Sequence, residues 1–200
     1  MFIYIRKQSI CLLIGLMCAA VVYADSPGYQ YIELVYSENN PDEKSLANQG
    51  GFTVSGSMPL SSRFYGFGWF NHAEIELCWE ECPVQNRIIH TMDDWLLLGL
   101  GYHWPLRDNT DLTAAIDYQS VDLDGSRDHG GGVLLGVRTR PTDAWGLGLQ
   151  VGYFKLEFDD FQIISDVTYK ISEHLDIVGR IRDFNDWDYT SYEGGIRYRF

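Results

Sequence analysis

A two-residue alternation of apolar with small or polar side chains is the feature that most constrains this chain. It recurs in residues 110–121, 161–171 and 192–200, and in residues 145–154, WGLGLQVGYF, the apolar set is Trp145, Leu147, Leu149, Val151 and Tyr153. Successive side chains of a strand point to opposite faces, so each run has one apolar face. From residue 25 on, no stretch has a helical period, and none has the roughly 18 apolar residues of a membrane helix. The chain is therefore predicted to be all-β.

Two kinds of connection, short turns and longer loops, separate the alternating runs and follow each other in alternation along the chain. Short turns are predicted near Pro59, Pro105, Pro141 and Ser172. Longer, mostly acidic loops are predicted at residues 37–50, 73–93, 122–131, 157–160 and 185–190. These four turns and five loops delimit ten antiparallel strands, none of them interrupted by proline. Eight strands are the alternative, because residues 157–160 are few for a loop.

Charged residues on the less apolar face decide between two kinds of closed barrel. A transmembrane barrel turns its apolar face toward lipid, whereas a soluble, lipocalin-like barrel turns it toward a ligand. Residues of both signs on the other face cannot form an apolar pocket but can pair inside a narrow lumen. We therefore predict a closed antiparallel transmembrane β-barrel whose lumen charge network is formed by Glu33, Asp117, Arg138, Arg140, Asp166, Lys170, Arg180, Arg182, Glu193 and Arg197.

The first 24 residues are predicted to be a secretory signal peptide. Arg6 and Lys7 precede an apolar run and a small residue, Ala24, after which cleavage is expected. The barrel domain then covers residues 25–200. Of the four cysteines, the two outside the signal peptide, Cys78 and Cys82, are predicted to form a disulfide, because exported proteins meet oxidising conditions. A metal site would need two further ligands at a recognised spacing and is not predicted.

Aromatic residues gather near the ends of the predicted strands, as in the aromatic girdles of membrane barrels. Toward the turns lie Tyr102, Trp104, Trp145, Tyr169, Tyr198 and Phe200, and toward the loops lie Tyr36, Trp69, Tyr118, Tyr153, Phe161 and Tyr192. The chain also ends on an aromatic residue within an alternating run. This end resembles the C-terminal signal that the barrel-assembly machinery of outer-membrane proteins recognises, carried here by Tyr192, Ile196, Tyr198 and Phe200.

The layout as a whole resembles the small outer-membrane β-barrel proteins of gammaproteobacteria. The segments that carry the resemblance are YIELVYS, GGFTVSGSMPLSSRFYGFGWF, WLLLGLGYHWPLRDNTDLTAAIDYQ and the closing hairpin. It is most similar to the quorum-factor or immunity-activator family described in xanthomonads. This resemblance implies a bacterial outer-membrane location but transfers no catalytic residues.

Three classes of function are open to such a barrel. About ten strands leave little free lumen, so a general diffusion pore is not expected, although a narrow channel for small solutes is the alternative. An enzyme would need a hydrolytic cluster, and the five histidines, His72, His90, His103, His129 and His174, are scattered, with Asp93 and Asp94 the nearest acids to His90. We therefore expect no enzyme and no cofactor. A structural or surface-interaction role, carried by the loops, is favoured.

Net charge bears on the expected partners. The chain carries a formal charge of −13 at pH 7, which disfavours nucleic acid. Acidic residues dominate the predicted loops and should repel the phosphates of lipopolysaccharide unless Mg²⁺ or Ca²⁺ bridges them. The expected partners are thus outer-membrane lipid and lipopolysaccharide, through divalent cations, and the barrel-assembly machinery. The protein is expected to be a monomer.

Overall fold

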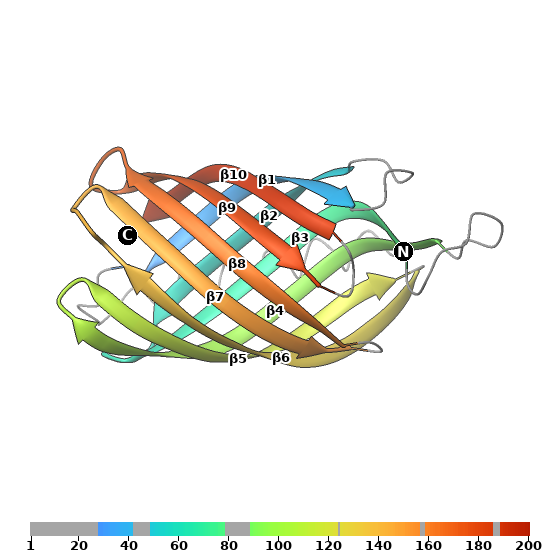
Figure 1. Ribbon diagram of the computed structural model, residues 1–200, viewed down its shortest axis with the longest axis horizontal. Helices are drawn as coiled ribbons and strands as arrows, with labels where there is room; N and C mark the ends of the chain where they lie inside the picture. Colours follow the sequence, from blue (N-terminus) through green and yellow to red (C-terminus); the bar gives the residue numbers. More distant parts are fainter. Residues whose placement is uncertain (1–27, 42–48, 79–88, 124, 157–158, 186–188) are drawn as a thin grey trace.

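The structure, a computed structural model, describes residues 28–41, 49–78, 89–123, 125–156, 159–185 and 189–200. The described residues form one closed antiparallel barrel of ten strands in which each strand pairs with its neighbours in the sequence and the first pairs with the last (Figure 1). The strands are β1 Tyr31–Pro41, β2 Gln49–Pro59, β3 Phe64–Cys78, β4 Ile89–Arg107, β5 Thr110–Leu123, β6 Ser126–Thr139, β7 Trp145–Lys155, β8 Asp159–Lys170, β9 Leu175–Phe184 and β10 Tyr189–Arg199. The predicted fold class and strand count are confirmed. No helix among these residues has the length and hydropathy to span a membrane.

Apolar side chains cover the outer wall of the barrel. Phe52, Ile116 and Phe161 expose 59%, 62% and 59% of their surface, although burial is the usual fate of such residues in water-soluble proteins. The residues next to them face the lumen and are small, polar or charged, as Thr53, Ala115 and Gln162 show. The sheet therefore closes with its apolar face outward, which is the orientation that a lipid environment requires.

Both described ends of the chain lie at the same end of the barrel as the short turns, which we call the turn side; it is on the left in Figure 1. Three of these turns are held by a hydroxyl group, and in the first Ser61 Oγ accepts hydrogen bonds from the backbone N–H groups of Arg63 and Phe64. Thr142 Oγ1 accepts hydrogen bonds from the backbone N–H groups of Ala144 and Trp145, and Ser172 Oγ does the same for His174 and Leu175. Such local bonds fix the turns without long connections.

The opposite end, the loop side, differs from the prediction because the hairpins continue farther. Strands β3 and β4 extend into the predicted loop 73–93, as far as Cys78 and from Ile89. Most of the predicted loop 122–131 is also wrong, since β5 runs to Leu123 and β6 begins at Ser126. The sequence Asp124–Gly125 suits a two-residue hairpin turn, and Gly125 has the positive φ, 76°, that such turns require.

Proline at position 105 is the second departure from the prediction. We expected no proline inside a strand, but β4 continues through Pro105 to Arg107, and the predicted turn lies just beyond it at Asp108 and Asn109. The pairing with β5 shifts register between Pro105 and Arg107. A bulge of this kind accommodates a residue that lacks a backbone N–H, so the hairpin reaches past the proline.

Candidate functional site in the barrel lumen

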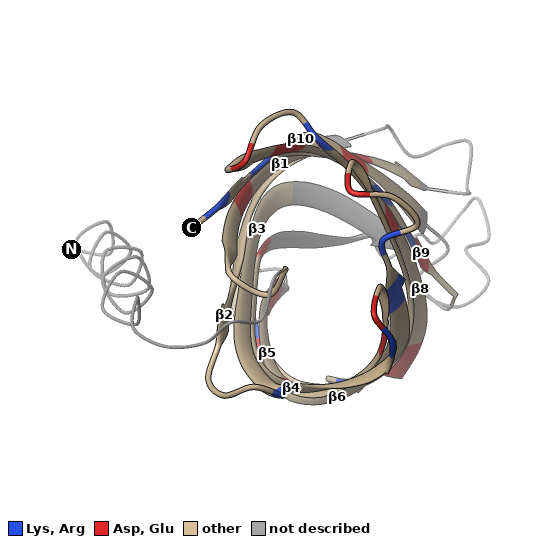
Figure 2. Cartoon of the chain, turned by 90° about the vertical axis from the view of Figure 1, so that its left-hand side faces the viewer, with Lys and Arg blue, Asp and Glu red and all other residues tan. Residues whose placement is uncertain are grey.

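The lumen contains three layers of side chains between the turn side and the loop side. A cavity lies at the turn side, a network of ion pairs follows, and an aromatic cluster fills the part next to the loops. Figure 2 looks into the barrel from the turn side and shows basic and acidic residues on β8, β9 and β10. The middle layer contains half of the predicted lumen charges.

Glu33 is the centre of the charge network. Its carboxylate accepts hydrogen bonds from Arg180 Nη2 at 2.6 Å and from Arg197 Nη2 at 2.6 Å and Nε at 2.9 Å. Glu193 accepts from Arg180 Nη1 at 2.6 Å and from Arg182 Nε at 3.3 Å. Strands β1, β9 and β10, which include both strands of the closing pair, thus share one chain of charges. Because Glu33 is only 1% exposed, its charge depends on these partners.

The other five predicted network residues lie elsewhere. Arg138 and Asp166 line the turn-side cavity, and Arg140 lies at its rim just after β6. Asp117 Oδ1 accepts a hydrogen bond of 2.7 Å from Gln119. Lys170 is the last residue of β8 and is exposed. It forms no ion pair among the described residues.

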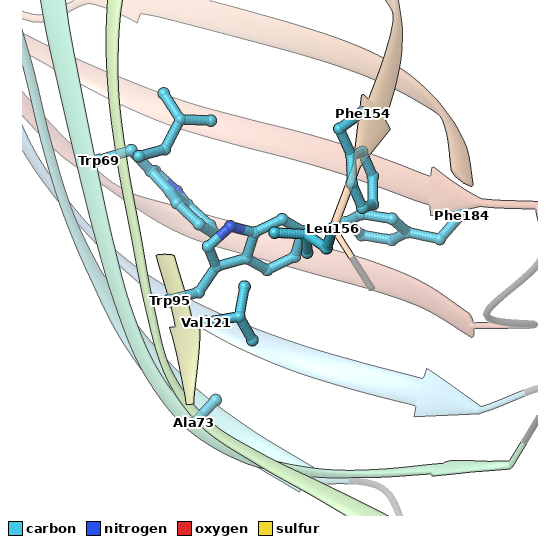
Figure 3. Close-up of a cluster of buried hydrophobic side chains, with 8 residues drawn as sticks. Trp69, Ala73, Trp95, Val121, Phe154, Leu156 and Phe184 are labelled. Atoms are coloured by element: carbon cyan, nitrogen blue, oxygen red, sulfur yellow. The ribbon is translucent and has the colours of Figure 1, made fainter. Parts of the chain in front are cut away.

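Large apolar side chains fill the lumen next to the loops. This aromatic cluster consists of Trp69, Ala73, Trp95, Leu97, Val121, Phe154, Leu156 and Phe184. Figure 3 shows Trp69, Trp95, Phe154 and Phe184 directed toward one another. Trp95 is its centre: its ring lies 5.0 Å from Trp69, 5.6 Å from Phe154 and 5.7 Å from Phe184. The Trp95 indole N–H donates to Gln119 Oε1 at 3.2 Å. These large side chains, buried to 1% exposure at Trp95 and 0% at Phe154, fill this part of the lumen.

Trp69 corrects the predicted aromatic girdle. We placed it on the outer wall, but it lies in the lumen and is 8% exposed. The guanidinium of Arg182 stands 4.7 Å from its ring centre and joins the aromatic cluster to the charge network. Alternation alone could not assign this face, because the stretch FYGFGWF carries aromatic residues at both odd and even positions. The other eleven predicted girdle residues alternate with lumen-facing positions and lie on the outer wall.

The turn-side cavity has a volume of about 560 Å³. Tyr29, which precedes β1, forms part of its wall: the ring stacks on His103 at 4.5 Å and lies 4.6 Å from Tyr65. The Tyr29 hydroxyl donates to Asp111 Oδ2 at 3.0 Å. Neither this cavity nor the aromatic cluster was predicted from the sequence. The alternation of the strands places Trp95 and Phe154 on the lumen face, and this was the sequence signal that could have predicted the cluster. The cavity has no such signal, because it depends on residues from many strands.

The structure describes the residues of the predicted assembly signal but not both cysteines of the predicted disulfide. Tyr192, Ile196, Tyr198 and Phe200 lie on the outer wall at the end of the chain, each about half exposed. Cys82 lies outside the described residues, as does the predicted signal peptide, so the structure gives no contact for the cysteine pair. Among the described residues, no group of three or more His, Cys, Asp or Glu side chains is arranged to hold a metal ion.

Comparisons with known proteins identify the fold. No protein-family profile matches the sequence, and no curated protein sequence matches it. The NanC porin aligns with a TM-score of 0.56 at 9% identity, over 84% of this chain and 100% of that one. An outer-membrane channel from Pseudomonas putida aligns with a TM-score of 0.51 at 10% identity, over 89% and 100%. The KdgM porin in complex with oligogalacturonate aligns with a TM-score of 0.50 at 11% identity, over 84% and 99%. The chain therefore shares the β-barrel fold of outer-membrane proteins.

Proposed function

We propose that this protein is an outer-membrane β-barrel with a closed lumen, which serves as a rigid scaffold for its loop-side surface. The observation that carries this proposal is the filled lumen. The aromatic cluster occupies one part, and behind it the ion pairs of Glu33 and Glu193 tie three strands together. A barrel filled in this way supports surface contacts better than passage of solutes.

The outer wall supports the proposed location. Apolar side chains such as Leu135, Val151 and Ile163 are half exposed or more around the barrel, and no water-soluble barrel would leave such a band uncovered. The predicted signal peptide and the outer-membrane origin of the similar structures agree with this location. We propose no catalytic activity, because the five histidines are dispersed over both ends of the barrel. His72, His90 and His129 lie near the loops, and His103 and His174 near the turns.

A narrow channel is the second candidate, and the turn-side cavity favours it. The cavity opens about 560 Å³ of the lumen, and arginines line it. Two similar structures are porins and a third is a channel, although at about 10% identity their transport activity does not transfer to this chain. Under this alternative the aromatic cluster would have to move aside during passage.

Single-channel recording in planar lipid bilayers separates the two candidates. We expect no unitary conductance steps from the refolded residue 25–200 protein. The double variant Trp69→Ala, Trp95→Ala removes the two indoles of the cluster and should produce steps. Trp145→Ala, which removes an indole from the outer wall, is the matched control and should stay silent. Stable steps from the unmodified protein would support the channel and contradict the closed scaffold.

A further inference from the structure

The turn-side cavity has the volume and lining of a small-molecule site. Its volume of about 560 Å³ is within the usual range for ligand pockets. From the geometry we propose that it binds a small organic anion, with a carboxylate held by Arg138 and Arg140 and an apolar ring against Tyr29 and His103. The lumen need not conduct for this site to form, so the inference is independent of the proposed function.

Arg138 is the principal cation of the site. Its guanidinium carbon lies 5.4 Å from the ring centre of Tyr29, which positions it over the cavity wall. Asp166 on β8 acts on it electrostatically, but the two form no ion pair among the described residues. In the strand register, Gly148 lies between them, opposite Arg138 on one side and Asp166 on the other. Because glycine has no side chain, the Asp166 carboxylate lies over Gly148, and both Asp166 and Arg138 line the cavity.

The other charges near the cavity are mostly engaged. Asp111 accepts the hydrogen bond of Tyr29 and lies 3.5 Å from His103 Nδ1. Arg197, which also lines the cavity, is bound twice by Glu33. Arg199 pairs with Asp176 at 2.9 Å. Among the described lining residues, Arg107, Arg138 and Arg140 therefore remain as cations without an ion pair, against the carboxylates of Asp108 and Asp166.

Arg140 lies in a surplus of positive charge. Partial desolvation and the like charge of the nearby Arg199 both lower the pKa of Arg140. An added anion would relieve this repulsion. Guanidinium groups bind the planar carboxylate through paired hydrogen bonds, which favours a carboxylate as the anionic group. Tyr29 and His103 also line the cavity and supply an aromatic contact for the rest of the ligand.

Titration calorimetry with the refolded residue 25–200 protein in detergent micelles tests the site, with benzoate, uncharged benzamide and inorganic phosphate as probes. Benzoate should bind saturably, and benzamide should not. Arg138→Gln and Arg140→Gln should each weaken benzoate binding by about tenfold or more, since each removes a charge-assisted contact. Arg63→Gln is the matched control: Arg63 lies on the same side but contacts Tyr102 outside the cavity, and its loss should leave binding unchanged.

Heat-modifiable gel mobility shows whether each variant has folded. If Arg138→Gln fails to fold, Arg140→Gln decides, because Arg140 lies outside the strands. The proposal is overturned if benzoate binds no better than benzamide, if neither cavity variant weakens it, or if phosphate binds and benzoate does not. Absence of conductance in bilayers would leave it intact.

Discussion

At the scale of single residues, Glu33 determines the energetics of the lumen. Its carboxylate is buried and neutralises two guanidinium groups from β9 and β10. Charges removed from water are stable only while their partners remain, so loss of one carboxylate leaves buried cations uncompensated. The free energy of unfolding should therefore depend far more on Glu33 than on an exposed acid.

Glu33→Gln should lower the free energy of unfolding by about 3 kcal/mol or more. The measurement is urea-induced unfolding of the protein in lipid vesicles, followed by tryptophan fluorescence. Glu173→Gln, the same substitution in an exposed turn, is the control and should change stability by less than about 0.5 kcal/mol. Equal effects of the two substitutions would show that the lumen ion pairs contribute nothing to the free energy of unfolding.

At the scale of elements, the pairing of β1 with β10 closes the barrel, and two adjacent glycines of β10 differ there. A Cβ added at Gly195 would collide with the backbone carbonyl of Leu34 on β1, whereas nothing lies within 4 Å of a Cβ at Gly194. Backbone cannot rotate away as a side chain can. The closing pair therefore has one position that requires glycine and one that does not.

Gly195→Ala should destabilise the barrel by about 1–3 kcal/mol through overpacking against β1. Gly194→Ala makes the same chemical change one residue away and should be close to neutral. Both are measured by unfolding in lipid vesicles together with the folded fraction by heat-modifiable mobility. If the two variants are equally stable, β1 and β10 do not approach each other as closely at Gly195 as the structure shows.

The end of β10 carries the predicted assembly signal. Deletion of Phe200 should reduce the folded protein in the outer membrane of expressing cells, because the assembly machinery would lose its terminal aromatic residue. Refolding of the same variant into detergent should be unaffected, since Phe200 is 54% exposed and contributes little packing. If the deletion lowers the yield in cells and the yield of refolding in detergent equally, Phe200 stabilises the folded barrel and does not act as an assembly signal.

At the scale of the whole molecule, alternation predicted the strands, because outward and inward side chains leave a period of two along each of them. The four turns and five loops predicted the strand number, and the charges on the less apolar face predicted the transmembrane barrel. The inward position of Glu33, Arg180 and Arg197 also follows from that period. Their ion pairs do not, because they depend on how β1, β9 and β10 meet when the barrel closes. The prediction of which face Trp69 occupies was wrong for a different reason, because its strand has aromatic residues on both faces.

Depth-resolved fluorescence quenching tests the central claim, the outward direction of the apolar face. Single-tryptophan variants, with the other tryptophans replaced by phenylalanine, are refolded into vesicles of lipids brominated on the acyl chains. Trp104 and Trp145, 60% and 46% exposed on the outer wall, should be strongly quenched, and Trp69 and Trp95 in the lumen should not. Quenching of Trp69 and Trp95 together with shielded Trp104 and Trp145 would reverse the two faces and contradict the account.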